Sequence, residues 1–202
     1  MKYTFDNDYK GAMIILENIL KKIYPNEIFT EENKKFLVLY SILKISDKPN
    51  DILKEIGVSV GEQTYYAKYP KIRKLRDQLK SIYERFENVC KRDNNAFGGF
   101  IGFLEWWYEE MDENGEHHCY YCGVKETISK DAFENKKLYS KKFTGGLQID
   151  RKDPDKGYNK YNCVFACVLC NNAKSDMISE TNFKKYFGKA TKAFWDYISN
   201  EK

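Results

Sequence analysis

The chain has 202 residues, of which 42% are hydrophobic and 32% are charged. Its 34 Lys and Arg residues against 30 Asp and Glu residues leave a net charge of only +4, which excludes a uniformly basic protein and makes any nucleic-acid footprint a local one. No apolar run opens the sequence and none is long enough for a membrane span, so we expect a soluble, cytoplasmic protein.

The first part of the chain, residues 1–95, is expected to be helical. Apolar residues recur every three to four positions up to Ile23, and Pro25 follows as a stop. Thr30 is the expected N-cap of a second helix, and a third apolar stripe predicts a helix over 69–91. These stripes indicate only that the helices pack on one another. We expect the region itself to select the substrate or to bind a protein partner. The stripes comprise Ala12, Ile15, Leu16, Ile19, Leu20 and Ile23, then Phe36, Leu37, Tyr40, Ile42 and Leu43, then Ile72, Leu75, Leu79, Ile82, Phe86 and Val89.

A segment rich in turn-forming residues, 93–99, is the predicted domain boundary. We therefore expect a helical domain over 1–95 and a second domain over 96–202. The second domain should combine short strands with helices. The predicted elements are a helix over 100–111, a turn at 112–115, a strand over 147–150, a loop at 153–158, a strand over 164–168, a helix from Asn171 or Asn172, and a helix over 180–199.

Four of the six cysteines form two Cys-x-x-Cys pairs, Cys119 with Cys122 and Cys167 with Cys170. In a reducing compartment this spacing favours a tetrahedral Zn²⁺ site, and disulfide or redox use is the alternative. Because four thiolates leave no position for water, this zinc is expected to be structural. A zinc-ribbon scaffold without activity is the competing interpretation. The other two cysteines, Cys90 and Cys163, are expected to be small buried residues.

Two polar residues beside the cysteines suggest a second cation. Mg²⁺ and Mn²⁺ prefer oxygen ligands, and Mg²⁺ takes only one or two from the protein. Asp150 at a strand end and Asn171 at a helix start could supply that pair if the strand–loop–strand–helix segment folds back on itself. The alternatives are that Asp150 caps a turn beside Arg151 and that Asn171 caps its helix.

Read in order, these motifs resemble those of the HNH endonucleases, a family with a ββα-metal finger. The resemblance runs through the two cysteine pairs, the Ile-Asp-Arg-Lys-Asp segment ending at Asp153, the Gly157-Tyr158 loop, Asn162, and the Asn-x-x-Lys segment ending at Lys174. It covers about residues 100–187 and is closest to the phage and mobile-element branch, which leaves a phage, mobile-element or defence setting open. It implies an α+β, mostly α fold: a helical N-terminal region, a zinc-stabilised ββα finger and a C-terminal helix.

The resemblance also implies an activity and a role for each matching residue. The activity is hydrolysis of phosphodiester bonds in DNA, most naturally double-stranded. Asp150 and Asn171 would hold the catalytic Mg²⁺ or Mn²⁺, and the side chain of Asn162 would tie the loop between the strands to backbone. Lys174 would face the site and bind phosphate. The insertion between the cysteine pairs is either a phosphate-contacting arm or a solvated loop, and the lysines that suggest such an arm are Lys136, Lys137, Lys141 and Lys142.

One position departs from the family's pattern. The general-base histidine normally follows the metal-binding Asp, and this chain has Arg151 there. An arginine keeps its proton near neutral pH, so Arg151 could bind a phosphate oxygen but could not act as a base. The base would then be Asp153, which we favour, a hydroxide on the cation, or one of His117 and His118. The alternative function is a catalytically decayed HNH-derived zinc module that binds DNA or a protein partner.

Overall fold

The computed structural model describes residues 5–42 and 48–200. The chain divides into two compact units, residues 1–105 and 106–202, and the division falls within helix α6 (Phe100–Glu109). The sequence places the break before this helix. The aromatic contacts of α6 explain the difference, because Phe103 near its start packs on Phe86 of the first unit whereas Trp106 packs on Phe165 of the second. No helix within the described residues has both the length and the apolarity needed to span a bilayer.

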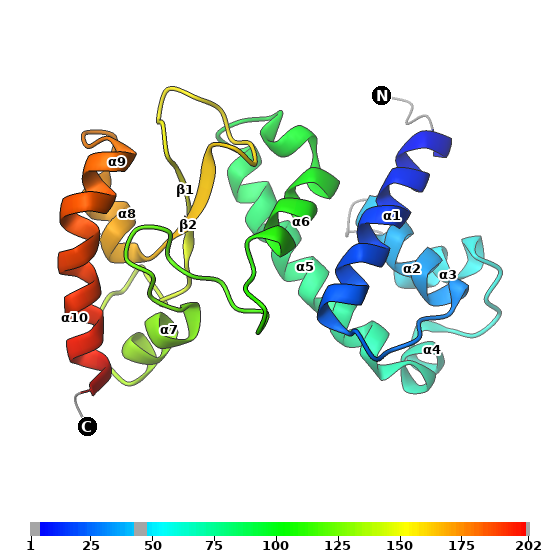
Figure 1. Ribbon diagram of the computed structural model, residues 1–202. Coiled ribbons are helices and arrows are strands. Elements are labelled where there is room, and N and C mark those ends of the chain that lie inside the picture. Colours follow the sequence, from blue (N-terminus) through cyan, green and yellow to red (C-terminus); the bar gives the residue numbers. More distant parts are fainter. Residues whose placement is uncertain (1–4, 43–47, 201–202) are drawn as a thin grey trace. The chain divides into compact units, whose positions relative to one another are not determined.

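The first unit is helical, as the apolar stripes predict (Figure 1). The Oγ1 atom of Thr30 accepts a hydrogen bond from the backbone N–H of Asn33 at 3.2 Å, so Thr30 is the expected N-cap. The predicted position Leu43 lies outside the described residues, as does the side chain of Ile42. The helices are α1 (Phe5–Ile23), α2 (Glu31–Ile42), α3 (Pro49–Glu55), α4 (Glu62–Lys68) and α5 (Pro70–Cys90), followed by the 3-10 turn η1 (Ala96–Gly98).

The second unit is built on two short antiparallel strands, β1 (Gln148–Arg151) and β2 (Cys163–Ala166). Gln148 pairs with Ala166 and Arg151 with Cys163. Helix α8 (Val168–Lys174) follows β2 almost directly, and the strand–loop–strand–helix order is the expected ββα arrangement. The predicted α+β, mostly helical fold is therefore confirmed.

The C-terminal helical segment packs along α8 and the insertion (Figure 1). It consists of α9 (Glu180–Asn182), the π-helical turn η2 (Phe183–Phe187) and α10 (Gly188–Asn200), so the predicted helix over 180–199 contains one wide turn. Helix α7 (Glu126–Glu134) lies in the insertion and has no counterpart among the sequence predictions. Its apolar signal in the sequence is short, a spacing of four between Ile128 and Ala132, of which Ala132 is buried.

Helix α8 begins earlier than predicted. Its N-cap is Cys167, whose Sγ atom accepts a hydrogen bond from the backbone N–H of Cys170 at 3.5 Å. The prediction that Asn171 stands at the helix start is therefore wrong, since the backbone N–H of Asn171 already donates to the carbonyl of Cys167 at 2.9 Å. Asn171 lies inside the helix, and its side chain is available for other contacts.

The core of the second unit is an aromatic cluster around Phe165 of β2. The ring of Phe165 stacks on Trp106, with centroids 4.8 Å apart, and meets Trp107 edge-on at 4.9 Å. His117 packs against the same ring at 4.1 Å. The backbone N–H of Tyr120 donates to the carbonyl of Phe165 at 2.8 Å, which joins the first cysteine pair to β2.

Candidate metal centre and active site

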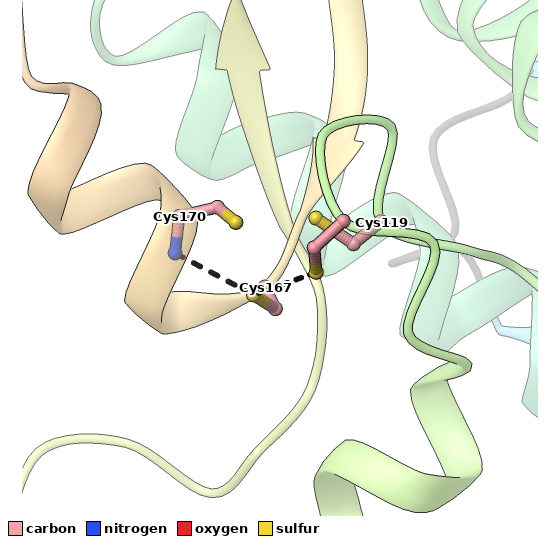
Figure 2. A group of neighbouring side chains, drawn as sticks. Cys119, Cys167 and Cys170 are labelled. Atoms are coloured by element: carbon pink, nitrogen blue, oxygen red, sulfur yellow. Dashed lines mark hydrogen bonds between the residues drawn. The ribbon is translucent and has the colours of Figure 1, made fainter. Parts of the chain in front are cut away.

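The four paired cysteines meet in one buried cluster. Their sulfur atoms all lie within 4.8 Å of one another, and Figure 2 shows the side chains of Cys119, Cys167 and Cys170 converging. The sulfurs of Cys122 and Cys167 are 3.8 Å apart. Four sulfurs at about 2.3 Å from a tetrahedral zinc would be about 3.8 Å from one another, whereas a disulfide would bring two of them to about 2.05 Å. The donor set therefore fits Zn²⁺.

The first cysteine pair is held in a tight turn. The backbone N–H of Cys119 donates to the carbonyl of Val124 and that of Gly123 donates to the carbonyl of Cys119, both at 2.8 Å. Gly123 has a φ of 76°, in the left-handed region where glycine is favoured. This turn presents both sulfurs toward Cys167 and Cys170, which belong to the start of α8.

One face of β1 meets one face of α8. Gln148 and Asp150 share a face of the strand because strand side chains alternate, and Asn171 and Lys174 share a face of the helix because they are one turn apart. The Nδ2 atom of Asn171 donates to Oε1 of Gln148 at 2.6 Å, and Nζ of Lys174 lies 3.3 Å from Oδ2 of Asp150. The fold thus sets Asp150 and Asn171 on facing elements, although they are far apart in the chain.

Neither the protein-family models nor the curated proteins contain a match. Among solved structures, the chain is similar to one described as the rare-cutting HNH restriction endonuclease PacI, with 22% identity over 58% of this chain and 81% of that chain and a TM-score of 0.47. The deciding observation is the chain's own order of β1, β2 and α8 around a buried four-cysteine cluster. The second unit therefore has a ββα fold that closes on four buried cysteines.

Within the second unit, the carboxylate of Asp150 is held through one oxygen. The hydroxyl of Tyr121 donates to Oδ2 at 2.6 Å, and the ammonium of Lys174 approaches the same atom. Oδ1 of Asp150 and Oδ1 of Asn171 have no hydrogen-bond partner among the described residues. Burial, together with the bond to Asp150, raises the pKa of Tyr121, so the phenol stays protonated as a donor. The contact of Tyr121 could not be predicted from the sequence, because nothing in a Cys-x-x-Cys turn indicates where an intervening side chain points.

Lys174 faces the site but is buried. Its side chain is only 1% exposed, and Nζ also donates to the carbonyl of Arg151 at 2.9 Å. An ammonium bound to the protein in this way has little freedom to meet a phosphate, which argues against the predicted phosphate-binding role. The contact instead supplies positive charge to Asp150.

Asn162 organises the loop of the second unit between β1 and β2. Its Nδ2 atom donates to the carbonyls of Asp153, Lys156 and Gly157 at 3.0, 3.2 and 3.1 Å. Its Oδ1 atom accepts a hydrogen bond from the backbone N–H of Asp153 at 3.0 Å. The side chain is buried, and its polar atoms form hydrogen bonds with backbone groups that would otherwise lack partners.

Arg151 and Asp153 also contact this loop. The guanidinium of Arg151 lies 5.0 Å from the ring centre of Tyr158, and Nη1 donates to the carbonyl of Lys156 at 3.2 Å. The carboxylate of Asp153 pairs with Nζ of Lys156 at 2.9 Å and accepts the backbone N–H of Asp155 at 3.1 Å. The hydrogen bond from Lys156 is the main reason why the pKa of Asp153 is lowered, which makes this carboxylate a weak base.

Neither histidine has a contact with the Asp150 and Asn171 side chains. His117 is buried in the aromatic cluster, and its Nε2 atom lies 2.8 Å from the carbonyl of Trp107. His118 is half-buried, with Nε2 2.8 Å from Oδ2 of Asp112. Hydrogen bonds from the backbone of Glu116, and then from His118, lower the pKa of Asp112 to about 2. Both histidines therefore help to hold the segment that leads into the first cysteine pair.

The two unpaired cysteines differ from each other. Cys163 is buried on β2, as expected, and burial raises its pKa to about 12. Cys90 is only half-buried, so the prediction for it is wrong. Its place as the last residue of α5 explains the exposure, since the apolar stripe of that helix ends at Val89.

The insertion lysines divide into two groups. Nζ of Lys137 donates to the carbonyl of Ile198 at 2.8 Å, so this residue helps to hold the insertion against the end of α10. Lys136, Lys141 and Lys142 are exposed to solvent. Their exposure fits both a phosphate-contacting arm and a solvated loop.

Proposed function

We propose that this chain is a metal-dependent endonuclease that hydrolyses phosphodiester bonds of double-stranded DNA. The observation that supports the proposal is the meeting of β1 and α8, with Asn171 bonded to Gln148 and Lys174 beside Asp150. Asp150 and Asn171 each keep a side-chain oxygen without a partner among the described residues. Oxygen donors are the ligands that Mg²⁺ and Mn²⁺ prefer, and two protein ligands leave room for water and phosphate.

In this proposal the chain's residues have distinct tasks. Asp150 and Asn171 hold the divalent cation, which when bound supplies positive charge to the phosphate as negative charge develops on it. Arg151 keeps Nη2 free of partners among the described residues, so it can donate to a phosphate oxygen while Nη1 holds the loop. The four cysteines hold a structural Zn²⁺ that keeps α8 against the first cysteine turn. Residues 1–95 select the substrate or bind a protein partner.

The attacking water needs a proton acceptor. Both histidines are engaged away from Asp150, through Trp107 and Asp112 respectively. Among the side chains considered, Asp153 remains the favoured candidate, and its lowered pKa keeps it ionised at neutral pH. The same shift reduces its basicity, so its contribution to the rate is expected to be smaller than that of a histidine base.

A second candidate function is favoured by the contact between Lys174 and Asp150. A buried ammonium 3.3 Å from the proposed cation ligand already neutralises its charge and would repel a divalent cation. Together with Arg151 in the base position, this fits a catalytically decayed HNH-derived zinc module that binds DNA or a protein partner. The two candidates differ in one property, which is whether the chain binds a divalent cation at Asp150.

The test is plasmid cleavage by the full-length, zinc-loaded chain with Mg²⁺ or Mn²⁺ and with EDTA. Asp150→Ala and Asn171→Ala are each expected to reduce the cleavage rate at least about 100-fold, as for loss of a major electrostatic contributor. Asp155→Ala is the matched control, because Asp155 is an exposed carboxylate in the loop that follows β1. DNA binding without cleavage by the unaltered chain would favour the second candidate, and cleavage that survives both alanine substitutions would refute the site.

A further inference from the structure

Tyr121 connects the cysteine cluster to the proposed cation site. It lies between Cys119 and Cys122 in the first cysteine turn, and its ring is buried against Phe183, with centroids 5.1 Å apart. Its hydroxyl donates to Oδ2 of Asp150 at 2.6 Å. The side chain that reaches Asp150 is therefore anchored at its backbone by two of the four cysteines.

The contacts around Asp150 are one-sided. Tyr121 and Lys174 both approach Oδ2, while Oδ1 has no hydrogen-bond partner among the described residues. The Asp150 side chain is 13% exposed, so little solvent competes for these contacts. A carboxylate held in this way cannot rotate freely, and it leaves a single oxygen for a cation.

We propose that Tyr121 is a positioning residue that fixes Asp150 as a one-oxygen ligand of the divalent cation. The inference rests on the proposed function, because it assigns Tyr121 a role at the same cation site. Its physical basis is preorganisation: a ligand whose orientation is fixed before the cation arrives loses less conformational freedom on binding. It also makes the cation site depend on the cysteine turn, since any shift of that turn moves the Tyr121 hydroxyl.

The neighbouring tyrosine supplies a matched control. Tyr120 occupies the other position between Cys119 and Cys122, and its hydroxyl donates to Glu180 at 2.5 Å, not to Asp150. Tyr121→Phe and Tyr120→Phe each remove one buried or half-buried hydroxyl from the same turn and keep the ring. Only the first substitution should alter the orientation of Asp150.

The experiment measures Mn²⁺ binding to the full-length, zinc-loaded chain without DNA, using electron paramagnetic resonance to count free Mn²⁺. Tyr121→Phe is expected to raise the dissociation constant about 10- to 100-fold, the usual effect of losing a residue that orients a metal ligand. Tyr120→Phe should change it less than about twofold. A merely structural role would lower the number of binding sites and leave the dissociation constant unchanged, so the two quantities are fitted separately.

Asp150→Ala separates the inference from the proposed function. If the unaltered chain binds no Mn²⁺, or if Asp150→Ala binds it equally well, the proposed cation site is refuted and the role of Tyr121 with it. If Asp150→Ala abolishes binding but Tyr121→Phe binds as tightly as the unaltered chain, only the inference fails. A Tyr121→Phe chain that has lost its zinc also refutes the inference, because Tyr121 would then support the cysteine cluster itself.

Discussion

Gly188, the first residue of α10, packs directly against the first cysteine turn. A Cβ atom at this position would lie 2.4 Å from the carbonyl oxygen of Tyr121 and 3.1 Å from its carbonyl carbon. The φ and ψ angles of Gly188 are −56° and −39°, which any residue adopts in a helix. Gly188→Ala therefore introduces no backbone strain, and its penalty is the steric overlap alone.

Two opposing effects decide the size of the change. Alanine favours a helix over glycine by about 1 kcal/mol, whereas forcing an extra methyl into a packed contact costs about 1–3 kcal/mol. The clashing atom belongs to backbone between two cysteines, so it cannot move aside as a flexible side chain would. We therefore take a steric cost of about 2–3 kcal/mol, in the upper part of that range. After the helix gain of about 1 kcal/mol is subtracted, Gly188→Ala is expected to lower the free energy of unfolding of the second unit by about 1–2 kcal/mol.

Gly11 in α1 is the matched control, because a Cβ there would meet nothing within 4 Å. Gly11→Ala is expected to raise stability by up to about 1 kcal/mol. The assay is urea unfolding of the zinc-loaded chain, together with the rate of zinc transfer to a chromogenic chelator. Gly188→Ala should release zinc faster and Gly11→Ala should not. A Gly188→Ala chain that is as stable as the unaltered one, with unchanged zinc release, would refute the close approach of α10 to Tyr121.

Three further changes test other parts of the second unit. Metal analysis is expected to find about one zinc per chain. Cys170→Ser should weaken zinc binding and unfold the second unit, because three thiolates cannot complete the tetrahedron, and circular dichroism measures the unfolding. Asn162→Ala leaves several buried loop groups unpaired and should lower the free energy of unfolding by about 2–3 kcal/mol in denaturant titrations, and an unchanged value would contradict its role in the loop. Asp153→Asn should slow cleavage less than about tenfold, and a larger loss would identify Asp153 as a strong base. Because Lys156 lowers the pKa of Asp153 in the folded state, the ion pair stabilises the fold at neutral pH and loses this effect as the pH falls through the lowered pKa. The stability difference between Asp153→Asn and the unaltered chain should therefore shrink in acid, as measured by thermal unfolding at several pH values.

Local features of the chain were predictable from the sequence. The Cys-x-x-Cys spacing, the apolar stripes and the cap at Thr30 depend on residues a few positions apart, where covalent geometry leaves few alternatives. The order of strand, loop, strand and helix follows from the same short-range signals. The start of α8 was misplaced because its cap is Cys167, and a cysteine sulfur is not among the usual N-cap groups.

Contacts between distant segments were decided by the tertiary structure alone. The hydroxyl of Tyr121 reaches Asp150, and the ammonium of Lys174 is buried against the same carboxylate instead of facing solvent. Hydrogen bonds depend on the direction of each side chain to within a few tenths of an ångström, and sequence spacing carries no such information across a folded chain. The amino-acid sequence thus determined which groups are available for metal binding and chemistry, whereas the packing of β1, α8 and the first cysteine turn determined which of them meet.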